Sequence, residues 1–329
     1  MTDTAIIQAN MAITSIEWTR STDGTQGYTW NPLRGCSKIS TGCENCYAIS
    51  MAVRFSGPGQ PYEGFAKSNP CNWTGVVGMV PERMKDPLRW SRPRMVFVNS
   101  MSDLFHEKVP DTWIDEIFAV IALAPQHTFQ ILTKRAERMC QYFSHEWHRR
   151  VASILIERKS EISKKQDIQR LQGRSFGALT CGDHERRVLP NVWLGVSAED
   201  QQRAVERIPW LLKTPAAVRF ISAEPLIGEM NLGVLCDGLD WIIVGGESGP
   251  SARPCHVEWI RSLVWQCKEA DVPVFVKQVG ANPWLDPGEL ARRRSEPGYK
   301  PLHDAKGGDP SEWPEDIRVR EFPRSAVPS

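Results

Sequence analysis

Residues 192–225 read VWLGVSAEDQQRAVERIPWLLKTPAAVRFISAEP and decide the expected fold. The apolar runs Val192–Ser197 and Val218–Ser222 are predicted as buried strands, and Gln201–Leu212 between them has the apolar spacing of a helix. A strand, a helix and a second strand in this order are typical of two parallel strands joined by a crossover helix. The stretch therefore predicts an α/β fold built on a parallel sheet.

The same alternation continues over much of the chain from about residue 94. Further strands are predicted at Met95–Asn99, Thr128–Thr133, Trp241–Gly245 and Val274–Lys277, and a shorter one at Ile16–Thr19, which a connector joins to Tyr28–Asn31. Further helices are predicted at Trp113–Leu123, Ala136–Arg150 and Val257–Ala270. This many repeats predicts a partial or closed βα barrel that occupies residues 1–329 as a single domain. A doubly wound open sheet is the alternative.

A second distinctive stretch, WNPLRGCSKISTGCENCYA at residues 30–48, contains Cys36, Cys43 and Cys46. Its Gly, Pro, Ser, Thr and Asn residues are typical of a loop, which argues against three unrelated buried cysteines. The apolar residues that follow have helical spacing, so residues 28–56 are predicted as a cysteine loop followed by a helix. Clustered thiolates repel one another unless a metal ion or an iron–sulfur cluster neutralises them.

Three interpretations of these cysteines remain open. A structural zinc site needs a fourth ligand, for which Cys71 is the candidate. A thioredoxin-like redox pair of Cys43 and Cys46 leaves Cys36 without a role. A [4Fe–4S] cluster held by three cysteines leaves one iron open for a substrate or cofactor.

Polar residues follow the predicted strands where each strand ends. They are Asn99, Ser102, Ser197, Glu199, Glu224, Glu247 and Lys277. In a βα barrel the carboxyl ends of the strands converge on the catalytic face, although a single such residue is more often the N-cap of the next helix. Two acids and a lysine together, Glu224, Glu247 and Lys277, favour a functional role over capping.

Composition sets limits on location and partners. The 329 residues are 41% hydrophobic and 24% charged, and no apolar run approaches the ~20 residues of a membrane span. The chain is therefore predicted to be soluble, with no membrane partner. No secretory signal is recognised at the N-terminus, so a reducing cytoplasm is expected for the nine cysteines.

Two segments depart from the strand and helix alternation. Residues 143–188 are rich in Lys and Arg and are predicted as a basic helical insertion, either a solvated helix face or a nucleic-acid-binding patch. The net charge of +1 gives the chain no general attraction to nucleic acid, so such binding depends on a local patch. Residues 283–329 are predicted as an extended C-terminal strap anchored by Trp284, Trp313, Ile317 and Phe322.

Several motifs together resemble one family. They are Trp30-Asn31-Pro32, the cysteine triplet with Tyr47-Ala48, Asn99-Ser100-Met101-Ser102-Asp103-Leu104-Phe105, Leu132-Thr133-Lys134-Arg135, Gly195-Val196-Ser197, Ser222-Ala223-Glu224-Pro225-Leu226 and Gly245-Gly246-Glu247-Ser248-Gly249. From about Ile16 to Phe322 the chain looks like the phage and bacterial three-cysteine-motif family, classed as a domain of unknown function. It is similar, more distantly, to radical S-adenosylmethionine enzymes, although six residues separate Cys36 from Cys43, more than is usual there.

The more distant resemblance implies a chemistry. It implies a radical S-adenosylmethionine or TIM-type barrel with a [4Fe–4S] cluster on Cys36, Cys43 and Cys46. S-adenosyl-L-methionine would bind the fourth iron, with Asn99 and Ser102 at its methionine end and Ser197 and Glu199 at its ribose. Glu224, Glu247 and Lys277 would handle substrate or protons.

Such an enzyme requires an electron donor, and nucleic acid is a candidate substrate through the basic insertion. The alternative from another class is a zinc- or cluster-stabilised nucleic-acid-binding protein without catalysis.

Overall fold

The computed structural model describes residues 13–21, 23–144, 146–158, 179, 188–295 and 302–324. The chain divides into two compact units. The first unit comprises Met1–Lys38, Ala48–Gly195 and Trp210–Ala217, and the second comprises Ile39–Tyr47, Val196–Pro209 and Val218–Ser329.

The secondary structure follows the predicted alternation. The strands are β1 (Tyr28–Trp30), β2 (Leu33–Arg34), β3 (Ala66–Ser68), β4 (Cys71–Trp73), β5 (Gly78–Met79), β6 (Met95–Val98), β7 (Thr128–Thr133), β8 (Val192–Ser197), β9 (Val218–Ala223), β10 (Trp241–Gly245), β11 (Cys255–His256), β12 (Val274–Gln278) and β13 (Pro283–Trp284). The α-helices are α2 (Tyr47–Arg54), α3 (Asp86–Arg89), α4 (Asp111–Leu123), α5 (Ala136–Ser144), α6 (Trp147–Arg158), α9 (Gln201–Lys213), α10 (Val257–Glu269) and α11 (Pro287–Arg294). Short 3-10 helices are η1 (Glu17–Thr19), η2 (Thr41–Cys43), η3 (Pro81–Arg83), η5 (Gly233–Cys236), η6 (Pro310–Glu312) and η7 (Glu315–Ile317).

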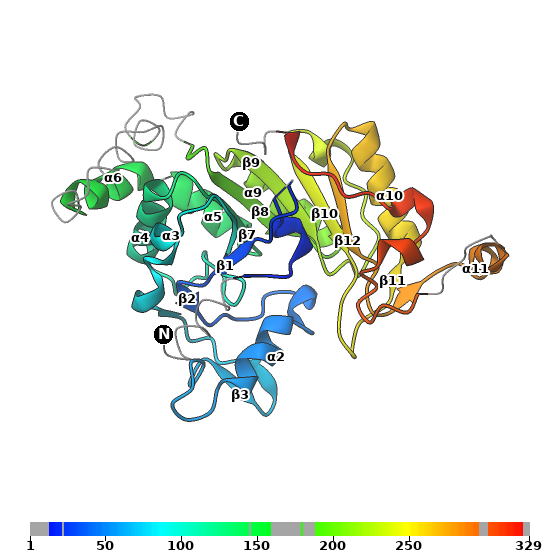
Figure 1. Ribbon diagram of the computed structural model, residues 1–329, viewed down its shortest axis with the longest axis horizontal. Coiled ribbons are helices and arrows are strands. Elements are labelled where there is room, and N and C mark those ends of the chain that lie inside the picture. Colours follow the sequence, from blue (N-terminus) through cyan, green and yellow to red (C-terminus); the bar gives the residue numbers. More distant parts are fainter. Residues whose placement is uncertain are drawn as a thin grey trace. The chain divides into compact units, whose positions relative to one another are not determined.

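The main sheet has seven strands in the order β1-β6-β7-β8-β9-β10-β12 (Figure 1). Pairing is parallel between β1 and β6, β6 and β7, β9 and β10, and β10 and β12. The predicted α/β class with a parallel sheet is confirmed. Because the order ends at β1 and at β12, the sheet of the described residues corresponds to a partial barrel rather than a closed one.

In the first unit, apolar strands and helices bury large aromatic side chains. All four residues of β6 are buried, as expected of a parallel strand that is covered on both faces. Trp30 is fully buried, and its indole N–H donates to the carbonyl oxygen of Arg83 at 2.8 Å, so the one polar atom of the indole is paired in the core. Helix α4 buries most of its apolar residues and packs against α6.

In the second unit, α10 lies against β10 and β12 (Figure 1) because its residues at helical spacing, including Ile260 and Val264, are buried. Trp241 is fully buried on β10, and its indole N–H donates to the carbonyl oxygen of Glu321. That carbonyl belongs to the C-terminal segment, so the tryptophan ties the end of the chain to the sheet.

The C-terminal segment 302–324 runs along β12. The amide of Val276 donates to the carbonyl oxygen of Val319, and the amide of Glu321 donates to that of Val274. Trp313 and Ile317 are fully buried, and Phe322 stacks on Trp241 with ring centroids 5.6 Å apart. Trp284 differs from the predicted anchors, since it is 42% exposed and its ring lies 4.4 Å from that of His256.

Two local predictions were wrong. Ile16–Thr19 is not a strand, because Thr19 turns back and donates from both its amide and its hydroxyl to the carbonyl oxygen of Ile16, which gives the 3-10 helix η1. The predicted helix Ala136–Arg150 is two helices, α5 and α6.

Most of the basic insertion predicted at residues 143–188 lies outside the described residues. In its described part, α6, Arg150 pairs with Asp115 at 2.7 Å and Arg149 pairs with Glu146 at 2.5 Å. In the described ranges of the chain, no helix has both the length and the apolar character needed to cross a membrane.

Candidate functional site

The cysteine loop from Ile39 to Tyr47 belongs to the second unit and docks on the end of β8. The amide of Gly42 donates to a carboxylate oxygen of Glu199 at 3.3 Å. A Cβ at position 42 would lie 2.7 Å from the carboxyl carbon of Glu199, so glycine is required there for close approach. Glu199 is fully buried and forms an ion pair with Arg207 at 2.8 Å, which holds its carboxylate in place.

A second contact fixes the same loop at the end of β10. Asn45 donates to Glu247 at 3.0 Å and to the carbonyl oxygen of Ser251 at 2.9 Å. Arg253 donates to both carboxylate oxygens of Glu247, at 2.6 and 2.9 Å, and reaches the carbonyl oxygen of Thr41 at 2.9 Å. Burial acts to raise the pKa of Glu247, but hydrogen bonds from Arg253 and Asn45 lower it below its ordinary value, so Glu247 is a carboxylate.

These contacts place Cys43 and Cys46 at the carboxyl ends of β8 and β10. Each cysteine is a direct chain neighbour of a residue that binds one of these strand ends, Gly42 or Asn45. Cys46 immediately precedes α2, so the third cysteine lies at a helix start as predicted, and Cys43 ends η2. Cys36 belongs to the first unit, where its sulfur lies 3.8 Å from a guanidinium nitrogen of Arg135.

The thiols fall into two groups by burial. Cys36, Cys43 and Cys46 are half-buried, Cys71 is exposed, and none of these four forms a disulfide. Cys140, Cys236, Cys255 and Cys267 are buried, and burial raises the pKa of Cys255 to about 12. The three loop cysteines and Cys71 are therefore more accessible to a metal ion than the four buried cysteines. No group of three or more His, Cys, Asp or Glu side chains stands ready to hold a metal ion in the part of the chain that the structure describes.

Glu224 and Lys277 are brought together in the second unit. Their charged atoms lie 2.9 Å apart, and the hydroxyl of Ser222 donates to the other carboxylate oxygen of Glu224 at 3.3 Å. Both side chains are partly exposed, at 13% and 23%, so the pair is open to a ligand. Gly245 makes room for Glu224, since a Cβ there would lie 2.6 Å from the carboxylate oxygen. Glu247 binds Arg253 instead of joining this pair.

In the first unit, Asn99 lies just after β6 with a left-handed backbone, at φ 60°. Its side-chain oxygen accepts from the amide of Leu33 at 3.4 Å. Its side-chain nitrogen is buried and has no hydrogen-bond partner among the described residues. Buried donors are nearly always paired in native proteins, so this nitrogen is a candidate ligand contact.

Ser102 and Ser197 were also predicted at the cofactor, and their contacts are with the protein backbone. Ser102 donates from its hydroxyl to the carbonyl oxygen of Leu33 at 3.2 Å. Ser197 is 4% exposed, and its carbonyl oxygen accepts from Arg207 at 2.7 Å.

Sequence reasoning assigned no role to Asn45, Arg207 and Arg253, which hold the cysteine loop or its carboxylate partners, or to Arg135, which contacts Cys36 and Ser37. Arg135 had one sequence signal, its position directly after the predicted strand Thr128–Thr133 and Lys134. Arg207 and Arg253 have no such signal, because an arginine on a helix or in a loop is normally a solvated surface residue.

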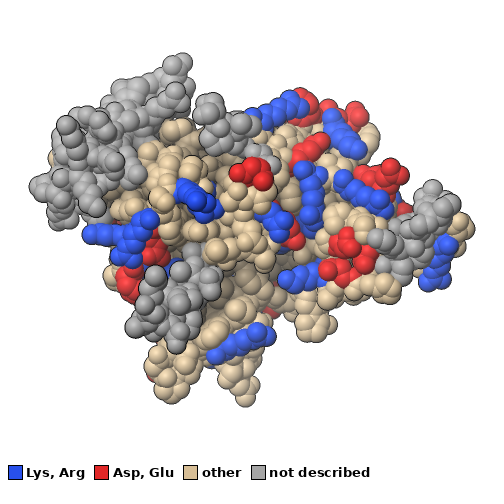
Figure 2. Space-filling view, in the orientation of Figure 1, with Lys and Arg blue, Asp and Glu red and all other residues tan. Residues whose placement is uncertain are grey.

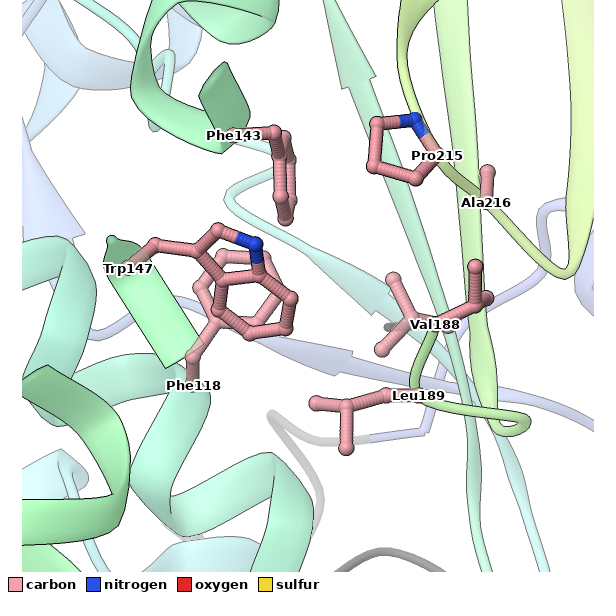
Figure 3. A pocket seen from close by; sticks show the side chains of 8 residues that line it. Phe118, Phe143, Trp147, Val188, Leu189, Pro215 and Ala216 are labelled. Atoms are coloured by element: carbon pink, nitrogen blue, oxygen red, sulfur yellow. The ribbon is translucent and has the colours of Figure 1, made fainter. Parts of the chain in front are cut away.

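Two hollows among the described residues contain no predicted site residue. One, shown in Figure 3, is enclosed by Phe118, Phe143, Trp147 and apolar neighbours, and has a volume of about 10 Å³, no more than one water molecule needs. The other is an open groove of about 740 Å³ in the first unit, lined by residues that include Met84, Trp113 and Glu116. Figure 2 shows basic and acidic side chains interspersed over the described residues of one face, with no continuous basic surface there.

Comparison with curated proteins and with solved structures found no match. A family model described as "Protein of unknown function (DUF5131)" matches residues 13–300. That match agrees with the predicted membership of a family of unknown function. Since it covers most of the described sequence, the chain belongs to this family.

Proposed function

We propose that this chain is an iron–sulfur enzyme of the radical S-adenosylmethionine type, with Cys36, Cys43 and Cys46 as the cluster ligands. The observation that carries the proposal is the docking of the cysteine loop on Glu199 and Glu247. Cys43 and Cys46 are thereby held at the carboxyl ends of parallel strands, the edge where ligands of open and closed α/β sheets bind. A loop that only connects two elements at the surface does not require two buried carboxylates, Glu199 and Glu247, to hold it at the ends of two strands.

The residues present fit such a group in their chemistry. Three cysteine side chains outside disulfides, on one short segment, supply soft ligands, and a guanidinium nitrogen of Arg135 lies 3.8 Å from the sulfur of Cys36. The unpaired side-chain nitrogen of Asn99 is a donor suited to the carboxylate of S-adenosyl-L-methionine. When bound, such a cluster would supply, with an electron donor, one-electron chemistry for cleaving a carbon–sulfur bond of S-adenosyl-L-methionine and so for hydrogen abstraction from a substrate.

The chain's own residues then have separate tasks. Glu199 and Glu247 hold the loop through Gly42 and Asn45, and Arg253 ties Glu247 to the loop backbone. Glu224 and Lys277, paired and partly exposed, are the residues placed to exchange a proton with a substrate. Asn99 orients the cofactor, while Ser102 supports the backbone at Leu33.

The test is anaerobic purification followed by iron and acid-labile sulfide analysis, and then chromatography for 5′-deoxyadenosine and methionine after reduction with S-adenosyl-L-methionine. Cys46→Ala is expected to lose iron and sulfide, whereas Cys140→Ala, which removes a buried helical thiol, is expected to keep both. Cys71→Ala is expected to keep them too, because Cys71 is exposed on β4 and is not a ligand in the proposal.

Stoichiometric zinc without sulfide would contradict the proposal and favour a zinc-stabilised nucleic-acid-binding protein. Loss of the cluster in Cys71→Ala would show a fourth protein ligand, and so a structural or electron-transfer cluster.

A further inference from the structure

Arg135 has every donor of its guanidinium engaged within the first unit. Its Nε donates to Glu107 at 2.8 Å, and Nη1 donates to Asp103 at 3.0 Å and approaches the sulfur of Cys36 at 3.8 Å. Nη2 donates to the carbonyl oxygen of Ser37 at 3.2 Å and to its hydroxyl at 2.8 Å. These are five contacts for the five N–H groups of arginine, so no donor remains to bind a ligand.

The two acids hold the arginine rigidly. Asp103 is buried and also accepts from the hydroxyl of Thr133 at 2.7 Å and from the amide of Phe105 at 3.0 Å. Arg135 itself has a side chain that is only 5% exposed. Burial acts to lower the pKa of Arg135, but Asp103, Cys36 and Glu107 raise it further, so the guanidinium is a permanent charge.

The segment after Cys36 is held from a second side. The hydroxyl of Ser37 lies 2.9 Å from Nε2 of His106, and Nδ1 of His106 accepts from the amide of Lys108 at 3.1 Å. The proton of the neutral imidazole is therefore on Nε2 and is donated to Ser37. Arg135 and His106 together fix the backbone next to Cys36 at the ends of β6 and β7.

We infer that Arg135 is a positioning residue for Cys36: it fixes the sulfur in place and keeps a positive charge beside it. The inference rests on the proposed function, in which Cys36 is a cluster ligand. Partners that hold a metal ligand are commonly worth a 10- to 100-fold change in metal affinity, and charge and hydrogen bonds at the sulfur set the reduction potential of a cluster. A cation beside the sulfur stabilises the reduced cluster, which has the more negative charge.

The experiment compares the anaerobically purified full chain with Arg135→Gln, Arg135→Lys and Arg138→Gln. Arg138 is the matched control, since it lies on α5, pairs with Asp111 and has no contact with Cys36 among those that the structure gives. Arg135→Gln is expected to lose iron to a chelator about tenfold faster than the unaltered chain. It is also expected to have a more negative midpoint potential. Arg135→Lys is expected to restore the potential in part, because it keeps the charge, but not the iron retention, because it lacks the planar fork.

If Arg135→Gln does not fold, Glu107→Ala tests the same arginine, since Glu107 is 60% exposed in its side chain and its loss removes the partner of the Nε of Arg135, together with the approach of Glu107 to Nδ1 of His106 at 3.3 Å. The expected changes have the same direction and are smaller. One outcome would overturn the role of Arg135 and leave the proposed function standing. In it the unaltered chain binds a cluster, and Arg135→Gln and Arg138→Gln show the same iron retention and the same midpoint potential. Absence of iron and sulfide from the unaltered chain would overturn both.

Discussion

Replacing Gly42 by Ala tests whether Glu199 holds the cysteine loop. Gly42 is not among the glycines with a positive φ, so its backbone accepts an alanine, and the effect of the substitution comes from contact alone. The new methyl group would lie 2.7 Å from the carboxyl carbon of Glu199 and 2.9 Å from one of its oxygens. Glu199 cannot easily retreat, because it is fully buried and paired with Arg207.

The magnitude follows from the two contacts that change. A hydrogen bond to a charged group contributes about 1.5–3 kcal/mol, and overpacking of a filled site costs about 1–3 kcal/mol. Since Glu199 keeps Arg207 as a partner, we expect Gly42→Ala to lower the free energy of unfolding by about 2–5 kcal/mol. At about 2 °C per kcal/mol for a chain of this size, Tm is expected to fall by about 4–10 °C.

The assay is thermal unfolding followed by circular dichroism, with Gly57→Ala as the matched control. A Cβ at position 57 meets only the side chain of Gln60, at 3.7 Å, so this substitution is expected to leave Tm nearly unchanged. In a Glu199→Ala background, Gly42→Ala is expected to cost less, because the group that it strikes is gone. Equal Tm values for Gly42→Ala and Gly57→Ala would refute the docking of the loop on Glu199.

Two further predictions concern stability. Burial and the neighbouring Arg135 lower the pKa of His106 from 6.5. Below about pH 6.5 the unfolded chain therefore binds a proton that the folded chain does not. The free energy of unfolding has its full value above about pH 6.5 and decreases as the pH falls toward the pKa of the folded state. His106→Gln is expected to reduce that loss between neutral and mildly acidic pH, measured as urea midpoints, and an unchanged pH slope would count against it. Trp313→Ala is expected to cost about 3–5 kcal/mol in urea unfolding, because the indole is fully buried and its N–H binds the carbonyl oxygen of Gly307, whereas Trp265→Ala, on a side chain that is 62% exposed, is expected to cost little. Similar losses for the two tryptophan variants would show that the C-terminal segment does not depend on Trp313.

The strands of the sheet were predictable because they are short apolar runs with sharp polar ends. Val192–Ser197 and Trp241–Gly245 have the predicted limits, and the strand predicted at Val218–Ser222 continues only to Ala223. The spacing of apolar residues along the chain is enough to predict such strands from the local sequence. Ile16–Thr19 was mispredicted because a threonine hydroxyl hydrogen-bonds back to the chain, a choice that apolar content does not reveal.

The site was predictable in part, for a related reason. The end of a strand identifies Glu199, Glu224 and Glu247, but not their partners, since Arg207 is on a helix and Arg253 follows in a loop. Glu247 was assigned to substrate chemistry from its position, whereas its contacts with Arg253 and Asn45 support a role in holding the loop. Which arginine pairs with which carboxylate depends on distances in the folded structure, and a local sequence pattern does not indicate those distances.

The C-terminal segment that runs along β12 has a consequence for solubility. β12 ends the strand order of the main sheet, and an uncovered edge strand presents a row of N–H and C=O groups to which another chain can add. Residues 319–321 occupy that row, with Arg320 opposite Phe275 in an antiparallel bridge and Val319 and Glu321 bonded to the backbone on either side. Residues 319–321 thus shield the edge of the sheet from the addition of a strand of another molecule. A truncation before residue 319 would expose an aggregation-prone edge as well as weaken the fold.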